Sequence, residues 1–351
     1  MAALALFKTA LNLLHVSGVS RLLRPFLGGR GAIFMLHHVR PARPNGGFSP
    51  NGGLEVTPEF LDHVITLVKK LRYDCVSMDE MVKRVSSDSD GERPFACFTL
   101  DDGYRDNLIH GLPIFRKHNC PFAIYVSPAI ADSTCELWWK GLELLIARES
   151  RLELELAGEQ FVLTCATNRE KYHAWRSLYW PLRRLEQNEQ RQWIVRTCSS
   201  HGIDLIALCR AEAMGWDELR QISRDPLCTI GAHTIHHLAL ARLSEQEARE
   251  EIAGSASRIE AELGSRPRHL AYPYGDPLSA SPREFHLAQA LGFATAVTTR
   301  KGLIFGAHVK HLTALPRLSL SGDYQEPRYV EALLSGAPFM LFNGLKRVKV
   351  T

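Results

Sequence analysis

The sequence lacks the features that mark disulfide-rich, membrane-spanning or nucleic-acid-binding chains. Its eight cysteines form no Cys-x-x-Cys pair and no disulfide framework, which favours a reducing, cytoplasmic setting. The net charge is only +4, and no basic patch interleaved with aromatic residues is present, so nucleic acid is not an expected partner. Internal repeats and low-complexity tracts are also absent. These 351 residues, with 45% hydrophobic content, are typical of a soluble protein with a large core.

The N-terminal run Met1–Leu14 is apolar, but it is too short to cross a bilayer and makes a poor signal peptide. Leu4, Phe7 and Leu11 fall on one helical face. We expect this helix to pack on the protein. The alternative is peripheral contact with a membrane through an amphipathic N-terminal helix, helped by the arginines that follow it.

Buried strands and amphipathic helices alternate over most of the chain. The apolar runs Gly31–Leu36, Phe95–Leu100 and Phe122–Val126 predict strands, and capping signatures at Thr57 and Ser244 predict helix starts. This alternation predicts parallel βαβ units, in which chemistry gathers at the carboxyl ends of the strands. From about residue 137 to 209 the alternation stops, and a composition rich in Glu, Arg, Leu and Trp predicts an inserted helical subdomain.

Two adjacent carboxylates, Asp101 and Asp102, directly follow a predicted buried strand. Charges at the end of a buried strand are unfavourable unless they have partners. Binding of a metal ion or a role in catalysis would explain why both carboxylates stand there. If Asp102 binds the ion, Asp101 is free to accept a proton from a water that the ion acidifies. The alternative is that both aspartates cap the turn after the strand.

A second motif, His233–His237, places two histidines four residues apart after another predicted strand. On a helical turn, such side chains share a face and could reach one ion. Two imidazoles and one carboxylate leave positions open for water and substrate, as in catalytic sites. Ordinary surface histidines are the alternative, which the strand-end aspartates make less attractive.

A third strand end carries Tyr272–Gly275, in which Pro273 and Gly275 favour a sharp turn. A backbone N–H held there, that of Tyr274, could face a developing oxyanion. When this segment is taken alone, a plain turn is the better explanation.

These motifs resemble, in kind and in order, those of the polysaccharide deacetylases, which carry the domain also named for the chitooligosaccharide deacetylase NodB. The three motifs are Thr99–Tyr104, His233–His237 and Ala271–Gly275. The resemblance covers roughly residues 31–320 apart from the insert. It implies an α/β fold, a distorted (β/α) barrel, that removes acetyl groups from N-acetylated sugars.

The resemblance also implies roles for individual residues. Asp101 would be the base, and Asp102, His233 and His237 would bind a divalent metal, zinc first, with cobalt, nickel, manganese or iron as alternatives. Thr234 would brace the histidine loop by hydrogen bonding. The Tyr274 amide, in the turn that Pro273 shapes, would help to stabilise the oxyanion.

The sequence departs from the family pattern in three places, one of which is that the Asp-Trp motif of many members is not evident. Many members have an arginine shortly before the Pro-Tyr pair that orients the base; none stands there, and we expect Arg317 to pair with Asp101 instead. The late Leu-x-x-His that provides the general acid is also missing. His38 or His311 could replace it, and we favour His38 because its strand ends at the same mouth.

We therefore expect a metal-dependent carbohydrate N-deacetylase acting on N-acetylated oligo- or polysaccharides. The alternatives are a deacetylase of a lipid-linked or envelope glycan and a catalytically inactive carbohydrate-binding module. The expected domains are an N-terminal helical segment (1–30), the deacetylase domain (31–320) with its insert at about 137–209, and a C-terminal extension (321–351).

Overall fold

The computed structural model describes residues 2–43, 47–87, 93–344 and 346–348. Seven parallel strands form a closed barrel, because β1 pairs with both β5 and β12: Phe34 lies opposite Phe98 on one side and Leu318 on the other. The strands, in order around the ring, are β1 (Gly31–Leu36), β12 (Leu315–Ser319), β11 (Thr295–Lys301), β10 (His269–Ala271), β9 (Cys228–Ala232), β6 (Phe122–Val126) and β5 (Phe95–Leu100). The expected (β/α) barrel is confirmed.

Side chains alternate between the inside and the outside of this ring, as the two-residue period of a strand requires. In β5, the side chains of Phe95 and Cys97 join the inner cluster, whereas Ala96 and Phe98 join the larger cluster outside. The short strand β4 (Asp74–Cys75) pairs with the start of β5, and α4 (Met78–Ser86) packs its apolar face on the inner cluster. The barrel is therefore filled with side chains near the N-terminal ends of its strands.

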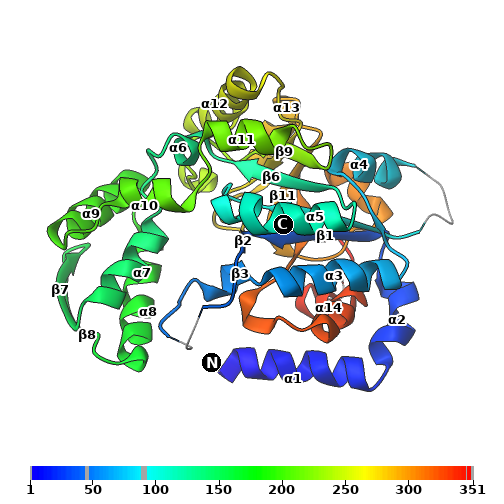
Figure 1. Ribbon diagram of the computed structural model, residues 1–351, viewed down its shortest axis with the longest axis horizontal. Coiled ribbons are helices and arrows are strands. Elements are labelled where there is room, and N and C mark those ends of the chain that lie inside the picture. Colours follow the sequence, from blue (N-terminus) through cyan, green and yellow to red (C-terminus); the bar gives the residue numbers. More distant parts are fainter. Residues whose placement is uncertain (1, 44–46, 88–92, 345, 349–351) are drawn as a thin grey trace.

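Helices cover the outside of the barrel (Figure 1). The residues at the ends of these helices form the caps that the sequence predicts. The Thr57 side chain accepts a hydrogen bond from the amide of Phe60, and Ser244 with Glu247 forms a capping box. Gly264 ends its helix with a φ of 77°, which glycine adopts without strain. These helices are α3 (Pro58–Lys70), α5 (Leu112–Lys117), α6 (Pro128–Ala131), α11 (Trp216–Ser223), α12 (Glu245–Leu263) and α13 (Pro282–Ala290).

Residues 136–213 leave the barrel and build a separate hydrophobic cluster at the left of Figure 1. Below, the insert means these residues. Its elements are α7 (Trp138–Arg148), β7 (Arg151–Leu156), β8 (Glu159–Thr164), α8 (Asn168–Arg184), α9 (Gln187–Ser200) and α10 (Leu205–Glu212).

The prediction that this segment is purely helical is wrong for β7 and β8, which pair as an antiparallel hairpin. Leu152, Leu154 and Leu156 are buried while the residues between them are exposed. That two-residue alternation is typical of a half-buried strand and does not fit a helix.

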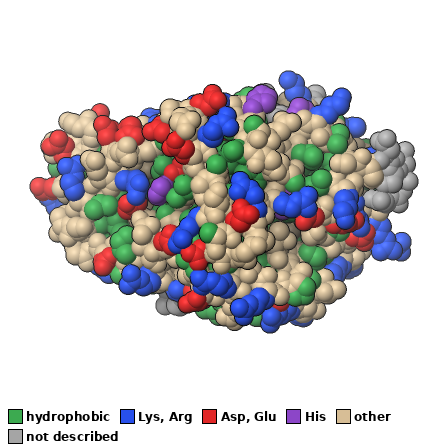
Figure 2. Space-filling model, turned by 90° about the horizontal axis from the view of Figure 1, so that it is seen from above, with side chains coloured by type: hydrophobic (Ala, Val, Ile, Leu, Met, Phe, Trp, Pro, Cys, Tyr) green, Lys and Arg blue, Asp and Glu red, His purple; other side chains and the backbone are tan. Residues whose placement is uncertain are grey.

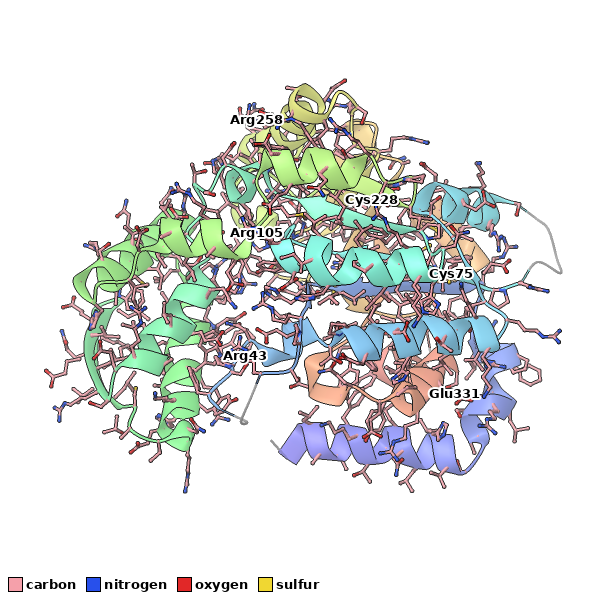
Figure 3. The ribbon with its side chains drawn as sticks, in the orientation of Figure 1. Arg43, Cys75, Arg105, Cys228, Arg258 and Glu331 are labelled. Atoms are coloured by element: carbon pink, nitrogen blue, oxygen red, sulfur yellow. The ribbon has the colours of Figure 1, made fainter. Side chains whose placement is uncertain are left out.

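Charged side chains join the insert to the barrel. Arg43 donates to Glu143 of α7 at 2.8 Å, and Arg105 donates to the carbonyl of Ala211 at 2.6 Å. Figure 3 labels both arginines at this junction. The insert is thus held against the rim of the barrel at more than one point.

Four further helices pack together at the lower edge of the molecule (Figure 1). They are α1 (Ala2–Val16), α2 (Val19–Leu27), α14 (Pro327–Leu334) and α15 (Ala337–Phe342). Leu11 of α1 is buried in the main core, and Phe7 contacts Tyr324 edge to face. The N-terminal helix therefore packs on the protein through the face that the sequence predicts.

Candidate metal centre and substrate pocket

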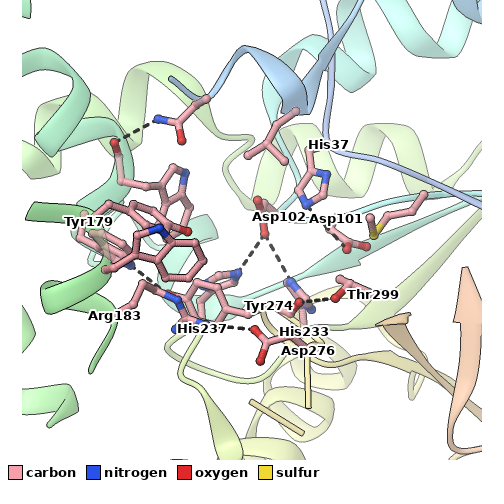
Figure 4. A pocket seen from close by; sticks show the side chains of 16 residues that line it. His37, Asp101, Asp102, Tyr179, Arg183, His233, His237, Tyr274, Asp276 and Thr299 are labelled. Atoms are coloured by element: carbon pink, nitrogen blue, oxygen red, sulfur yellow. Dashed lines mark hydrogen bonds and ion pairs between the residues drawn. The ribbon is translucent and has the colours of Figure 1, made fainter. Parts of the chain in front are cut away.

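A pocket of about 270 Å³ lies where the strand ends face the insert. Asp101 and Asp102 reach it from the end of β5, His233 and His237 from the loop after β9, and Tyr274 from the loop after β10 (Figure 4). Parallel strands bring these segments to one rim of the barrel although they are far apart in sequence.

The candidate metal ligands converge on one point. The Nε2 atoms of His233 and His237 lie 3.3 and 3.2 Å from Oδ1 of Asp102. The ligand atoms of this trio all lie within 4.8 Å of one another. His233 Nδ1 lies 2.7 Å from the carbonyl oxygen of Ala271, which holds the ring proton on Nδ1 and leaves the Nε2 lone pair facing Asp102.

This arrangement fits a divalent cation. Asp102 Oδ1 is buried and has no hydrogen-bond donor among the described residues, and burying an unpaired carboxylate oxygen is unfavourable. A cation would satisfy this oxygen and both imidazole nitrogens together. One oxygen and two nitrogen ligands suit zinc and several other divalent ions.

Asp101 has a different partner and does not belong to the trio. Arg317 of β12 donates from both terminal nitrogens to its carboxylate, at 2.7 and 2.6 Å. Arg317 also donates to the carbonyl of Thr298 and the hydroxyl of Thr99. Burial raises the pKa of Asp101, but the paired guanidinium more than offsets this and leaves the pKa below its ordinary value. Asp101 is therefore ionised at neutral pH, with Arg317 placed where the sequence predicts it.

The backbone is strained at each of the three strand ends. Asp102, Thr234, His237 and Tyr274 adopt φ values of 73°, 60°, 57° and 60°. Such left-handed conformations are unfavourable for residues other than glycine, and they persist where the surroundings impose them. At Asp102, the turn directs the side chain to the histidines although the preceding Asp101 points toward Arg317.

Thr234 does not brace the histidine loop as expected, because its hydroxyl is buried without a partner among the described residues. Other groups hold this loop. Ser127 donates to the carbonyl of His233 at 2.6 Å, and Glu251 accepts the amide of His236 at 2.9 Å. The supporting residues lie on neighbouring elements, so the local motif does not reveal them.

The turn at Tyr274 is held in place from the barrel. Thr299 of β11 donates its hydroxyl to the carbonyl of Tyr274 at 2.6 Å, and its amide to Gly275 at 3.1 Å. A side chain on Gly275 would stand 2.6 Å from the Thr299 nitrogen. Pro273 is buried and does not line the pocket; its carbonyl accepts the Gly275 amide. Within the described residues the Tyr274 amide makes no hydrogen bond, so it is available as a donor.

The structure places His38 outside the pocket. His38 is buried, its Nδ1 lies 2.7 Å from Asp106, and its ring stacks on Tyr104 at 3.6 Å. Its neighbour His37 lines the pocket instead, with Nε2 3.9 Å from Asp101. Strand alternation explains the difference: Ile33 belongs to the inner cluster, so the side chain four residues later points the same way.

The other predicted candidate for the general acid, His311, also lies away from the pocket. It ends the 3-10 helix η4 (Gly306–His311), which packs on α4 at the opposite end of the barrel. The positions of both predicted acids therefore do not support that role.

Aromatic side chains of the insert form the wall that faces the metal centre. Trp138 donates its indole N–H to the Tyr274 hydroxyl at 2.9 Å, and Arg183 lies 3.7 Å above the Tyr274 ring while pairing with Asp276. Trp180 lines the same pocket with 58% of its surface exposed. In Figure 4, Tyr179 and Arg183 lie opposite Asp101 and Asp102 across the pocket. The aromatic wall comprises Trp138, Trp139, Tyr179 and Trp180.

None of these insert residues was predicted as part of the site. Their positions depend on how the insert docks, and no local pattern in the sequence carries that information. His37 was also missed, but the alternation of the first strand could have indicated it.

Comparisons with known proteins agree with this geometry. The family model described as polysaccharide deacetylase matches residues 88–296, more than half of the chain. A search of curated proteins finds no match.

Solved structures share the fold. The Streptococcus pyogenes deacetylase PplD in complex with acetate is similar over 87% of this chain and 97% of that one, at 15% identity and a TM-score of 0.57. IcaB from Ammonifex degensii matches over 86% and 96%, at 15% identity and a TM-score of 0.52. A de-N-acetylase from Aggregatibacter actinomycetemcomitans matches over 86% and 98%, at 13% identity and a TM-score of 0.53.

Proposed function

The chain belongs to the polysaccharide deacetylase family, and from that premise we propose that it is a metal-dependent hydrolase that removes N-acetyl groups from N-acetylated glycans. One observation carries the proposal: Asp102, His233 and His237 present three ligand atoms to one point, while Asp101 stands beside them with a partner of its own. A metal ligand set next to an ionised, uncoordinated carboxylate is what hydrolysis by an activated water requires.

Asp102, His233 and His237 would hold the cation, with zinc as the first expectation. When bound, such an ion supplies Lewis acidity, which polarises a carbonyl and makes water more acidic. Asp101 takes the proton of the attacking water, and Arg317 keeps that carboxylate oriented and ionised beforehand. The free amide of Tyr274 donates to the oxygen on which negative charge develops.

His37 is the candidate that would protonate the leaving amine. It lines the pocket 3.9 Å from Asp101, so a proton accepted by the carboxylate has a short path to the imidazole. Burial lowers the pKa of His37, which keeps the ring neutral before that transfer. A His37→Gln variant should lose kcat by about 10²-fold or more, whereas unchanged kcat would exclude this role.

The aromatic wall supports a saccharide as the substrate. Trp180 and Tyr179 offer apolar rings at the mouth of the pocket, and the carbon-bound hydrogens of a pyranose ring can pack on such surfaces. Asn51 and Asp276 add polar groups on the same lining. The pocket thus combines apolar walls with a few convergent polar groups, as small-molecule sites do.

The test is acetate release from N-acetylated oligosaccharides by the metal-loaded protein, before and after exhaustive chelation. We expect release that stops on chelation and returns with added zinc. His237→Ala should lose both metal and activity, whereas His236→Ala is the matched control, because His236 bonds Glu251 and lies outside the trio. Full activity after chelation would contradict the proposal. Glycan binding without acetate release would favour an inactive carbohydrate-binding module.

A further inference from the structure

The outer face of the N-terminal helices carries apolar side chains that are largely exposed. In α1, Leu6, Leu13 and Val16 are 73%, 65% and 74% exposed. In α2, Leu22 and Phe26 are 72% and 70% exposed. These five residues are called the α1–α2 apolar face below.

This face is unusual for a helix on a protein surface, which normally turns polar side chains to water. α1 already buries Leu11 on its inner side, with Phe7 and Leu14 packed against the same core. Positions 6, 13 and 16 are spaced by seven and three residues, so they follow one another along the opposite side of the helix. A helix that is apolar on both sides is expected to have a second apolar environment.

We infer that the α1–α2 apolar face docks on the surface of a lipid bilayer that contains anionic lipids. Among the described residues, no helix is long and apolar enough to cross a membrane. The contact would therefore be peripheral, with the helices lying in the interface plane.

Charge around the face favours anionic lipid over other partners. Helices α1 and α2 contain Lys8, Arg21 and Arg24 but no Asp or Glu. Arg21 lies between the apolar positions of α2 with 66% of its side chain exposed. Lys8 of α1 is half-buried. Basic residues beside an interfacial apolar face strengthen binding to anionic headgroups.

Arg347, near the C-terminal end of the described chain, and Lys301 of β11 extend this pattern. Arg347 donates to the carbonyl of Phe26 at 3.3 Å, and Lys301 lies 5.5 Å from the ring of Phe342, which is itself 54% exposed. Glu331 of α14 also lies near the face, but it is largely buried and pairs with Arg21 and His15. Figure 3 labels Glu331 above α1. The neighbourhood of the face therefore keeps a basic excess.

The shape and charge of the face do not suit a second copy of the chain. α1 lies along the lower edge of the molecule (Figure 1). A two-fold interface would bring the basic side chains of α1 and α2 in one copy toward those of the other, because neither helix contains Asp or Glu. A bilayer, in contrast, is flat, apolar beneath its headgroups and negatively charged at its surface.

The opposite side of the molecule provides the contrast. Seen from above, acidic and basic side chains are intermingled, with hydrophobic side chains between them (Figure 2). Single exposed hydrophobic residues also occur elsewhere, such as Ile109, Val162 and Leu278, and isolated residues of this kind need no explanation. They serve as matched controls.

The test is cosedimentation of the full chain with vesicles of phosphatidylglycerol and phosphatidylcholine, compared with pure phosphatidylcholine. We expect stronger binding to the anionic vesicles, weakened by salt. Leu13→Ser with Phe26→Ser should reduce the partition coefficient about a hundredfold, at about tenfold for each lost apolar side chain. Val162→Ser with Leu278→Ser removes equally exposed apolar side chains elsewhere and should bind like the wild type.

Two results would overturn the inference. One is that the same fraction of the protein sediments with both vesicle types and that salt does not change this fraction. The other is a dimer in light scattering that Leu13→Ser with Phe26→Ser converts to a monomer, which would assign the face to a second copy. The inference does not rest on the proposed function: acetate release from a soluble oligosaccharide should be the same in this double variant and the wild type. That measurement also reports whether the variant is folded.

Discussion

The barrel and the insert contribute to the same pocket in different ways. The barrel supplies the ionisable groups, Asp101, Asp102, His233 and His237, from strand ends with strained backbone turns. The insert supplies the aromatic rings and one arginine whose charge is already paired. Under the proposed function, this difference predicts that bond breaking depends on the barrel and recognition of the substrate on the insert.

The largest expected effect tests the barrel side of this comparison. Asp101→Asn removes the proposed proton acceptor and should lower kcat by about 10²- to 10⁴-fold. Because Asp101 is not a member of the ligand trio, the variant should bind as much metal as the wild type. Metal content measured beside acetate release separates the two roles, and loss of the metal would show that Asp101 is a ligand.

The next prediction asks whether the insert folds as a unit of its own. Leu178→Ala opens a cavity in the core of the insert, where Leu178 is fully buried, and should lower the free energy of unfolding by about 2–5 kcal/mol. Five of the six tryptophans lie between residues 138 and 193, so their fluorescence reports mainly on the insert.

Leu61→Ala is the matched change in the barrel, because Leu61 is also fully buried but in the main core. It should shift circular dichroism more than tryptophan fluorescence. If circular dichroism and tryptophan fluorescence shift equally in both variants, barrel and insert unfold together. The two regions would then differ in their contribution to the pocket but not in their folding.

A pH-dependent effect is expected in the barrel. Burial lowers the pKa of His308 to about 4, whereas in the unfolded chain it is about 6.5. Between these values the unfolded state binds the proton and the folded state does not, so stability falls as the pH drops from about 6.5 to 4. The full effect is about 3 kcal/mol.

His308→Asn should flatten the pH dependence of barrel unfolding between these pH values. Asparagine is chosen because its amide oxygen can still accept the hydrogen bond that the Phe305 amide donates to His308. His286→Asn, at an exposed histidine, is the control and should leave the slope unchanged. A slope that persists in His308→Asn would assign the effect to other groups.

The smallest expected effect tests the insert side. Trp180→Ala removes an exposed ring from the pocket mouth. If a sugar covers roughly 50 Å² of this ring, its loss weakens binding by about 1.3 kcal/mol, or about tenfold in KM. kcat should stay the same, because the ring does not reach the reacting groups. Val162→Ala, exposed on the insert but outside the pocket, controls for general effects; a fall in kcat alone would argue against a separate recognition role.

The fold and the barrel part of the site could be predicted because their signals are local. Asp101 and Asp102 directly follow an apolar strand, and parallel strands carry such ends to one rim whatever the details of the loops. The ligand pair His233 and His237 follows the same logic. For residues that directly follow a parallel strand, their position in the sequence is enough to predict that they lie at this rim.

The remainder depends on information that one sequence does not contain. Trp180 and Arg183 reach the pocket only because a distant segment docks on the rim, and that docking has no local signature. His37 and the β7–β8 hairpin are a different case, since period-two alternation was present in both places. In both places the alternation of buried and exposed positions indicates a strand and the side to which each side chain points.

The pairing of Arg317 with Asp101 has a consequence for closure of the barrel. β12, which carries Arg317, is the last strand of the ring and lies beside the first. The carboxylate of Asp101 therefore gains its guanidinium partner only when β12 joins β1 and closes the ring. Ring closure and neutralisation of this charge are one event, and a sheet that stays open leaves the carboxylate without its arginine.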